Sequence, residues 1–145
     1  MFKHILFATD GSPASHGALH QCIAFARDAG ARVTGIHVVP KFHLIGYQSA
    51  MVVDSRAEAE EKHATLARRY LAEVEIAARE QGVPCETLSL PHEHPYEAII
   101  EVARERGCDL ICVASHGVTG MQGVLLGSET QKILNHSSLP VLVYR

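Results

Sequence analysis

The sequence predicts an α/β fold in which one open, parallel sheet carries helices on both faces. Short apolar segments typical of buried strands alternate, over all 145 residues, with longer segments whose apolar residues recur at helical spacing. Glycine or proline stands at most segment boundaries. Leu110–Ala114 is apolar at every position, as expected of a central strand covered on both faces. This alternation favours a single domain with a parallel sheet and crossover helices.

The first half of the chain contains two predicted strands, one predicted helix and a long loop. Lys3–Thr9 is a buried strand, and Ser12 can cap the helix that follows it. That helix ends at Gly30. Its apolar face consists of Ala18, Cys22, Phe25 and Ala29. Arg32–Val39 is the second strand, and Pro40–Asp54 shows no clear period and is predicted to be a loop.

The second half begins with the longest predicted helix. It starts at Ser55, where Glu58 completes a capping box, and it ends at Gly82. One face of this helix is formed by Ala59, His63, Leu66, Tyr70, Val74 and Ala77. The remaining elements are a strand at Cys85–Leu90, a helix from Pro95 to Gly107, a strand at Leu110–Ala114, a short helix from Ser128 and a strand at Pro140–Tyr144.

Composition narrows the range of functions. Thirteen Lys and Arg against sixteen Asp and Glu give a net charge of −3, and no basic face or arm indicates a nucleic acid partner. The apolar runs fall far short of the roughly 20 residues that span a bilayer, and the N-terminus does not resemble a signal peptide. Four cysteines without a CxxC pair indicate reduced thiols in a cytoplasmic protein. We therefore expect no nucleic acid and no membrane as partner.

The segment Ala114–Thr130 contains the densest chemical signal. Its loop glycines are Gly117, Gly120 and Gly123. Glycine lets a backbone approach a ligand closely, and Ser128 with Gln131 predicts a capped helix start. Free amides and the dipole at a helix N-terminus favour phosphate, although a tight connection with an ordinary cap explains the composition equally well. Ligands of open parallel sheets bind at the carboxyl ends of strands, where Asp10 and His116 are predicted to lie.

Other patterns support different chemistry less well. The pairs His16/His20 and His92/His94 have no further partner at the spacing that zinc needs, so we interpret them as surface imidazoles. Asp10, Ser115 and His116 suggest a hydrolytic triad, but no Gly-x-Ser-x-Gly elbow is present. The P-loop and the dinucleotide fingerprint are also absent. We therefore assign no catalytic residue and no metal ligand.

The frame Ala114-x2-Gly117-x9-Gly127-Ser128 resembles the motif Gly-x2-Gly-x9-Gly-(Ser/Thr) of the universal stress proteins that bind ATP. The other segments that look like this family, in its order, are Ile5–Ser12, Ile36–Val39 and Pro140–Tyr144. The resemblance therefore covers nearly the whole chain. One position departs from the motif, because Ala114 replaces its first glycine.

The resemblance implies a Rossmann-like sheet of five parallel strands in the order 3-2-1-4-5, similar to adenine nucleotide alpha hydrolases, in one universal stress protein domain (1–145). It implies that Asp10 contacts ribose and base and that the Val39 backbone recognises adenine. Phosphates would lie at Gly117 and at Gly127-Ser128, near the amide of Glu129. The full implied binding set is Thr9, Asp10, Val39, Ala114, His116, Gly117, Val118, Gly127, Ser128, Glu129 and Thr130.

We therefore expect a cytoplasmic stress-response protein that binds ATP or AMP as a regulatory signal, with Mg²⁺ or Mn²⁺ held through the phosphates. The resemblance also implies a homodimer through the C-terminal strand, and the protein partner stays unidentified. Any hydrolysis should be slow, because no base is evident that would activate water. Two alternatives stay open. One is a slow ATPase or nucleotide-transferring enzyme on the same scaffold, and the other is a family member that binds no nucleotide and acts through protein contacts.

Overall fold

The computed structural model of the chain describes residues 1–41, 50–116 and 126–145. Within these ranges five strands form one sheet: β1 (His4–Ala8), β2 (Arg32–Pro40), β3 (Cys85–His92), β4 (Leu110–Ala114) and β5 (Val141–Tyr144). The strand order is β3-β2-β1-β4-β5, and every neighbouring pair is parallel. This arrangement confirms the predicted fold and strand order.

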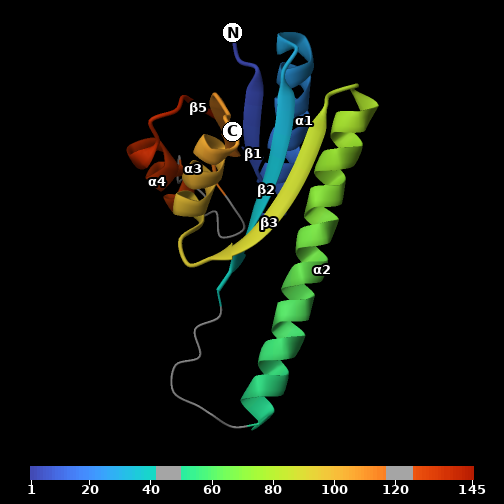
Figure 1. The fold of residues 1–145 in the computed structure, drawn as a ribbon, viewed down its shortest axis with the longest axis vertical. Coiled ribbons are helices and arrows are strands. Elements are labelled where there is room, and N and C mark those ends of the chain that lie inside the picture. The colour runs from blue at the N-terminus through green and yellow to red at the C-terminus, as the bar shows by residue number, and fades with distance from the viewer. Residues whose placement is uncertain (42–49, 117–125) are drawn as a thin grey trace.

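Helices cover both faces of the sheet, as predicted (Figure 1). The described helices are α1 (Pro13–Ala29), α2 (Ala50–Glu80), α3 (Pro95–Glu105) and α4 (Ser128–His136). The first two pack on one face, and the last two pack on the other.

The core consists of two layers, because successive residues of a strand point to opposite faces. Ile5 and Phe7 of β1 contact the layer of α1 and α2, whereas Leu6 between them contacts the layer of α3 and α4. All three side chains are fully buried. Every residue of β4 is buried as well, which confirms the prediction for Leu110–Ala114. These central strands therefore hold the carboxyl edge of the sheet in a fixed position.

The start of α2 differs from the prediction. The helix begins at Ala50, five residues before the predicted cap at Ser55, and Ser55 lies inside it. The segment 50–80 contains neither glycine nor proline, so nothing in the backbone stops the helix from extending past a residue that would otherwise favour a cap. The N-terminal part of α2 extends beyond the sheet (Figure 1).

Helix α1 follows the prediction at both ends. Ser12 is its N-cap and accepts a hydrogen bond from the Ser15 backbone N–H, and Gly30 ends it with a left-handed φ of 68°.

None of the helices in the described part of the chain combines the length and the apolar composition that a membrane span needs.

Candidate functional site

A cavity of about 700 Å³ lies at the carboxyl ends of the central strands. Its walls come from the ends of β1, β2 and β4, from one face of α2, and from the first turn of α4. Within the sheet, β2 lies next to β1 on one side and β4 lies next to β1 on the other side. The cavity therefore lies where the strand order reverses, which is the position at which open α/β sheets bind ligands.

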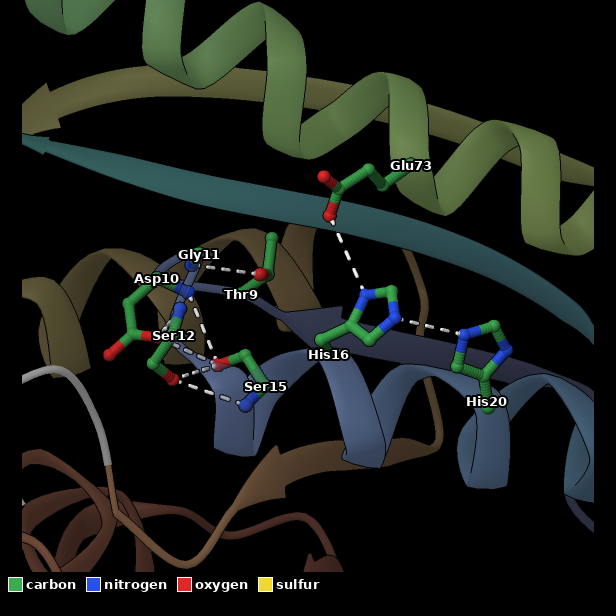
Figure 2. A network of polar contacts seen from close by, with 8 residues as sticks. All are labelled: Thr9, Asp10, Gly11, Ser12, Ser15, His16, His20 and Glu73. Carbon is green, nitrogen blue, oxygen red and sulfur yellow. Dashed lines mark hydrogen bonds and ion pairs between the residues drawn. The ribbon is translucent and has the colours of Figure 1, made fainter.

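The loop after β1 carries Asp10 (Figure 2). This residue lines the cavity. Asp10 Oδ1 accepts hydrogen bonds from the Ser12 backbone N–H at 3.0 Å and from Ser15 Oγ at 2.7 Å. Ser12 Oγ in turn accepts from the Ser15 N–H at 3.1 Å. The carboxylate thus lies at the N-terminus of α1, where the helix dipole favours negative charge. The first turn of α1 sets its orientation.

Tyr70 of α2 packs against the loop at Gly11. Gly11 has a φ of 77°, and a β-carbon at this position would overlap the Tyr70 ring. The same ring makes an edge-on contact with His37 of β2, with 5.3 Å between ring centroids. His37 Nδ1 lies 2.8 Å from the Thr9 carbonyl oxygen and donates to it. Tyr70 and His37 therefore connect α2, β2 and the loop into one wall of the cavity.

The opposite wall joins the end of β4 to α4. The Gly127 N–H donates to the Ser115 carbonyl at 2.6 Å, and Thr130 Oγ1 donates to the Ala114 carbonyl at 2.9 Å. Ser115 Oγ and His116 Nδ1 share a hydrogen bond of 2.9 Å. These contacts fix the first turn of α4 against β4, with its backbone amides at the cavity.

The cap of α4 corrects the prediction by one residue. Gly127 is the N-cap, Ser128 is the first helical residue, and no described side chain caps this end. Gln131 does not complete a capping box with Ser128, because its side chain donates to the Leu126 carbonyl at 3.0 Å. The bond from Gly127 to Ser115 places the cap one residue earlier than the local preference of serine indicates. The amides of the first turn therefore have no side-chain acceptor.

The Glu129 carboxylate connects α4 to α3. Its Oε2 accepts from the Tyr96 backbone N–H at 3.1 Å, and its Oε1 lies 3.3 Å from Lys132 Nζ. The N-cap of α3, His94, makes no side-chain cap bond, so Glu129 supplies an acceptor for that helix start. The resemblance predicted only a role for the Glu129 amide.

Most of the predicted binding set lies around the cavity. The residues that line it are Thr9, Asp10, Ala114, His116, Gly127, Ser128, Glu129 and Thr130. Val39 lines a second cavity of about 490 Å³, and Pro40 lines both. Gly117 and Val118 lie outside the described residues. Sequence reasoning did not assign His37, His63 or Tyr70 to the site, because their positions fitted ordinary strand and helix patterns.

The histidine pairs lie on the surface. His16 and His20 of α1 approach each other with 3.4 Å between their Nε2 atoms, and His16 Nδ1 lies 3.7 Å from Glu73 Oε2 of α2 (Figure 2). In the described ranges, no group of three or more His, Cys, Asp or Glu residues could hold a metal ion. The exposure of His16, His20 and His94 supports the interpretation of these residues as surface imidazoles.

The cysteines are free thiols. Cys22, Cys108 and Cys112 are buried, and Cys85 is half-buried. Burial raises the pKa of the Cys85 thiol to about 11, and it raises the pKa of the Cys108 thiol to about 11 as well. The thiols of Cys85 and Cys108 are therefore protonated at neutral pH, which argues against either of them being a reactive cysteine.

The comparisons with known proteins agree with the fold and with the family resemblance. The model of the Universal stress protein family matches residues 1–145. The Universal stress protein YxiE of Bacillus subtilis is 32% identical over 152 residues, which cover 100% of both chains.

Solved structures match as well. The structure of MJ0577 from Methanocaldococcus jannaschii is 28% identical, has a TM-score of 0.83, and matches over 99% of this chain and 96% of its own. A universal stress protein from Archaeoglobus fulgidus in complex with dAMP has a TM-score of 0.68 at 18% identity, over 99% of this chain and 98% of its own. With the family model matched from end to end, the chain belongs to the universal stress protein family.

Proposed function

We propose that this chain binds an adenine nucleotide in the cavity and works as a nucleotide-dependent regulator in the cytoplasm. One observation carries the proposal. Asp10, which follows β1, and the N-terminus of α4, which follows β4 and has no side-chain cap, line the same cavity. A volume of about 700 Å³ lies in the range of small-molecule sites. The A. fulgidus relative, which holds dAMP, shares the fold.

The placement of the nucleotide follows from the chemistry of the two walls. A phosphate at Gly127 and Ser128 would accept hydrogen bonds from the first-turn amides of α4 and would meet the positive end of its dipole. Asp10, oriented by α1, would accept from the ribose hydroxyls. The base would then extend toward the end of β2, where Val39 offers its backbone. Mg²⁺ or Mn²⁺ would be held chiefly by the phosphates.

The alternative of a family member that binds no nucleotide rests on Ala114. This residue is buried, lines the cavity and stands where the motif has glycine. Its carbonyl, however, accepts the Thr130 hydroxyl and holds α4 in place, so the backbone serves the site despite the added methyl group. This contact favours the binding function over the alternative.

The first test is mass spectrometry of small molecules released from the purified protein, together with calorimetric titration of nucleotide. Gly127→Asp should weaken nucleotide binding about tenfold, because it places a negative charge at the amides that receive phosphate. Gly17→Asp is the matched control, since Gly17 lies on the exposed side of α1 with open space around its β-carbon position.

A second variant separates charge from bulk. A β-carbon at Gly127 would lie 3.1 Å from the His116 Cα, so Gly127→Ala tests the steric effect alone. We expect Gly127→Ala to bind more tightly than Gly127→Asp. If the folded Gly127→Asp variant binds as well as the wild type, the phosphates lie elsewhere.

A further inference from the structure

Helix α2 lines the nucleotide cavity with three side chains of one face, His63, Leu66 and Tyr70. Their spacing of three and four residues places them on successive turns of the helix. One turn after Tyr70, the fully buried Val74 packs against Gly35 of β2, where a β-carbon would lie 2.9 Å from Val74 Cγ1. This close approach of helix and strand fixes the position of Tyr70 relative to the sheet.

The ring of Tyr70 extends from α2 to the loop after β1. Its Cζ and Cε atoms, at the end of the ring that carries the hydroxyl, occupy the space that a β-carbon of Gly11 would take. The edge-on contact with His37 supports the ring from β2, and His37 is itself held by its bond to the Thr9 carbonyl. The ring therefore contacts the backbone directly after Asp10 and is kept there by its neighbours.

The same loop is also held by the first turn of α1 (Figure 2). The Ser12 N–H and the Ser15 hydroxyl donate to one oxygen of the Asp10 carboxylate. These bonds set the rotation of the carboxylate, whereas the Tyr70 ring limits how far the backbone that carries it can move toward α2. Without the ring, the loop could shift at Gly11, because glycine restricts the backbone least.

We infer that Tyr70 is a positioning residue for sugar recognition, because its ring on Gly11 keeps Asp10 where the carboxylate accepts from the ribose hydroxyls. This inference rests on the proposed function, in which Asp10 contacts the ribose. A hydrogen bond weakens steeply as its angle and distance depart from the optimum, so a small displacement of the loop is enough to lose it. A chain without the ring would still bind base and phosphate, but it would lose its preference for a sugar with hydroxyls.

Calorimetric titrations with AMP and with 2′,3′-dideoxyAMP, which lacks both ribose hydroxyls, measure this preference as a ratio of two affinities. We expect the wild type to bind AMP about tenfold more tightly than the dideoxy compound. Tyr70→Leu keeps an apolar side chain in the wall but removes the ring from Gly11, so the ratio should fall by at least about threefold. Tyr70→Phe keeps the ring and should retain the wild-type ratio.

Leu66→Ala is the matched control, because Leu66 lies one turn before Tyr70 and lines the same cavity. This variant trims the wall, so it should weaken both ligands by the same factor and leave the ratio unchanged. Gly11→Ala disturbs the contact from the side of the loop, and it should lower the ratio as Tyr70→Leu does. It decides the question in the same way if Tyr70→Leu does not fold.

The outcomes separate the inference from the proposed function. If folded Tyr70→Leu keeps the wild-type ratio, or if Leu66→Ala lowers the ratio as much, the inference is wrong while nucleotide binding stands. If Tyr70→Phe loses the ratio as well, the hydroxyl contacts the sugar directly and the positioning role is wrong. A wild type that binds both ligands equally well also overturns the inference. If the wild type binds neither ligand, the proposed function is wrong and the inference goes with it.

Discussion

Gly11 is a position at which the described part of the site has no room for a side chain. Its φ of 77° and the Tyr70 ring over its α-carbon both exclude a β-carbon. We predict that Gly11→Ala lowers the free energy of unfolding by about 1–3 kcal/mol. It should also weaken nucleotide binding, because Asp10 precedes the strained residue. Urea unfolding and calorimetry measure the two effects.

The control for Gly11→Ala is Gly17→Ala. Gly17 lies within α1 with open space at its β-carbon position, and alanine favours a helix by up to about 1 kcal/mol over glycine. The two variants should therefore shift stability in opposite directions. Equal stability of both would show that Tyr70 moves aside without cost.

His4 makes the stability of the fold depend on pH. Its Nε2 lies 2.7 Å from Thr34 Oγ1, and the Thr34 hydroxyl donates to Glu86 Oε1 at 3.1 Å. Burial lowers the pKa of His4, the charge of Arg32 lowers it further, and the carboxylates of Glu86 and Asp109 oppose the shift. Below about pH 6.5 the unfolded chain binds a proton that folded His4 does not, so stability falls as the pH drops.

We therefore predict that His4→Gln reduces the loss of stability between about pH 7 and pH 5.5. Glutamine can donate to Thr34 without titrating, so the bond remains while the pH dependence of this position disappears. His20→Gln, at an exposed histidine of α1, is the matched control variant. Thermal unfolding midpoints at the two pH values decide the matter, and parallel profiles for His4→Gln and wild type would contradict the prediction.

Single-residue roles were predictable where one residue type has one strong preference. Asp10 and Gly11 end an apolar strand, and that pattern placed them at the carboxyl edge. Tyr70 and His37 carried no such signal, because an aromatic residue on a helix face and a histidine in a strand fit the core equally well. Their contact joins residues that are distant in the sequence, and local spacing does not report such contacts.

Helix and strand interiors were predicted better than their ends. The strand Leu110–Ala114 has the predicted bounds, because uniform apolarity specifies burial on both faces. The starts of α2 and α4 differ, since a serine favours a cap locally while the helix or a tertiary bond decides where the cap lies. For α4 the deciding bond runs from the Gly127 N–H to the carbonyl of Ser115, which follows β4. No local residue preference encodes this contact.

Ala114 at the end of β4 gives a prediction at this scale. Its φ is not positive, so the backbone does not require glycine here. Ala114→Gly should bind nucleotide more tightly, because it removes a methyl group from the cavity wall, and should lower stability by about 0.5–1 kcal/mol. Calorimetry and thermal unfolding measure both. If the wild type binds nothing and the variant binds, the chain belongs to the branch of the family that works without nucleotide.

At the scale of the molecule, alternation of strands and helices sufficed to predict a parallel sheet, and the family resemblance supplied its order. The position of β5 at the edge follows from that order. Its residues divide between the layers as their alternation predicts, with Leu142 and Tyr144 on the side of α1 and with Val141 and Val143 on the side of α3 and α4. All four are only partly buried, so this edge retains apolar surface.

The hydrogen bonds of β5 show which of its backbone groups are available to a partner. The carbonyls of Pro140 and Tyr144 accept from Ile111 and Ser115 at the β4 side. In a parallel ladder alternate residues face alternate neighbours, so Val141 and Val143 direct their N–H and C=O groups to the outer edge. Among the described strands, β5 pairs with β4 alone. Within the part of the chain that the structure describes, the outer edge of β5 is therefore a ladder without a partner.

We predict that this edge pairs with its copy across a two-fold axis, because antiparallel pairing of two β5 strands would satisfy the outer ladder and close the assembly at two subunits. Val143→Pro removes an outward N–H while the bonds of Leu142 and Tyr144 toward β4 remain, so it should shift the protein toward monomer without unfolding it. Val143→Ala, which trims the side chain but keeps the N–H, should stay closer to the wild type in assembly. Analytical ultracentrifugation at micromolar concentration measures the three proteins, and a monomeric wild type would show that the apolar edge serves another purpose.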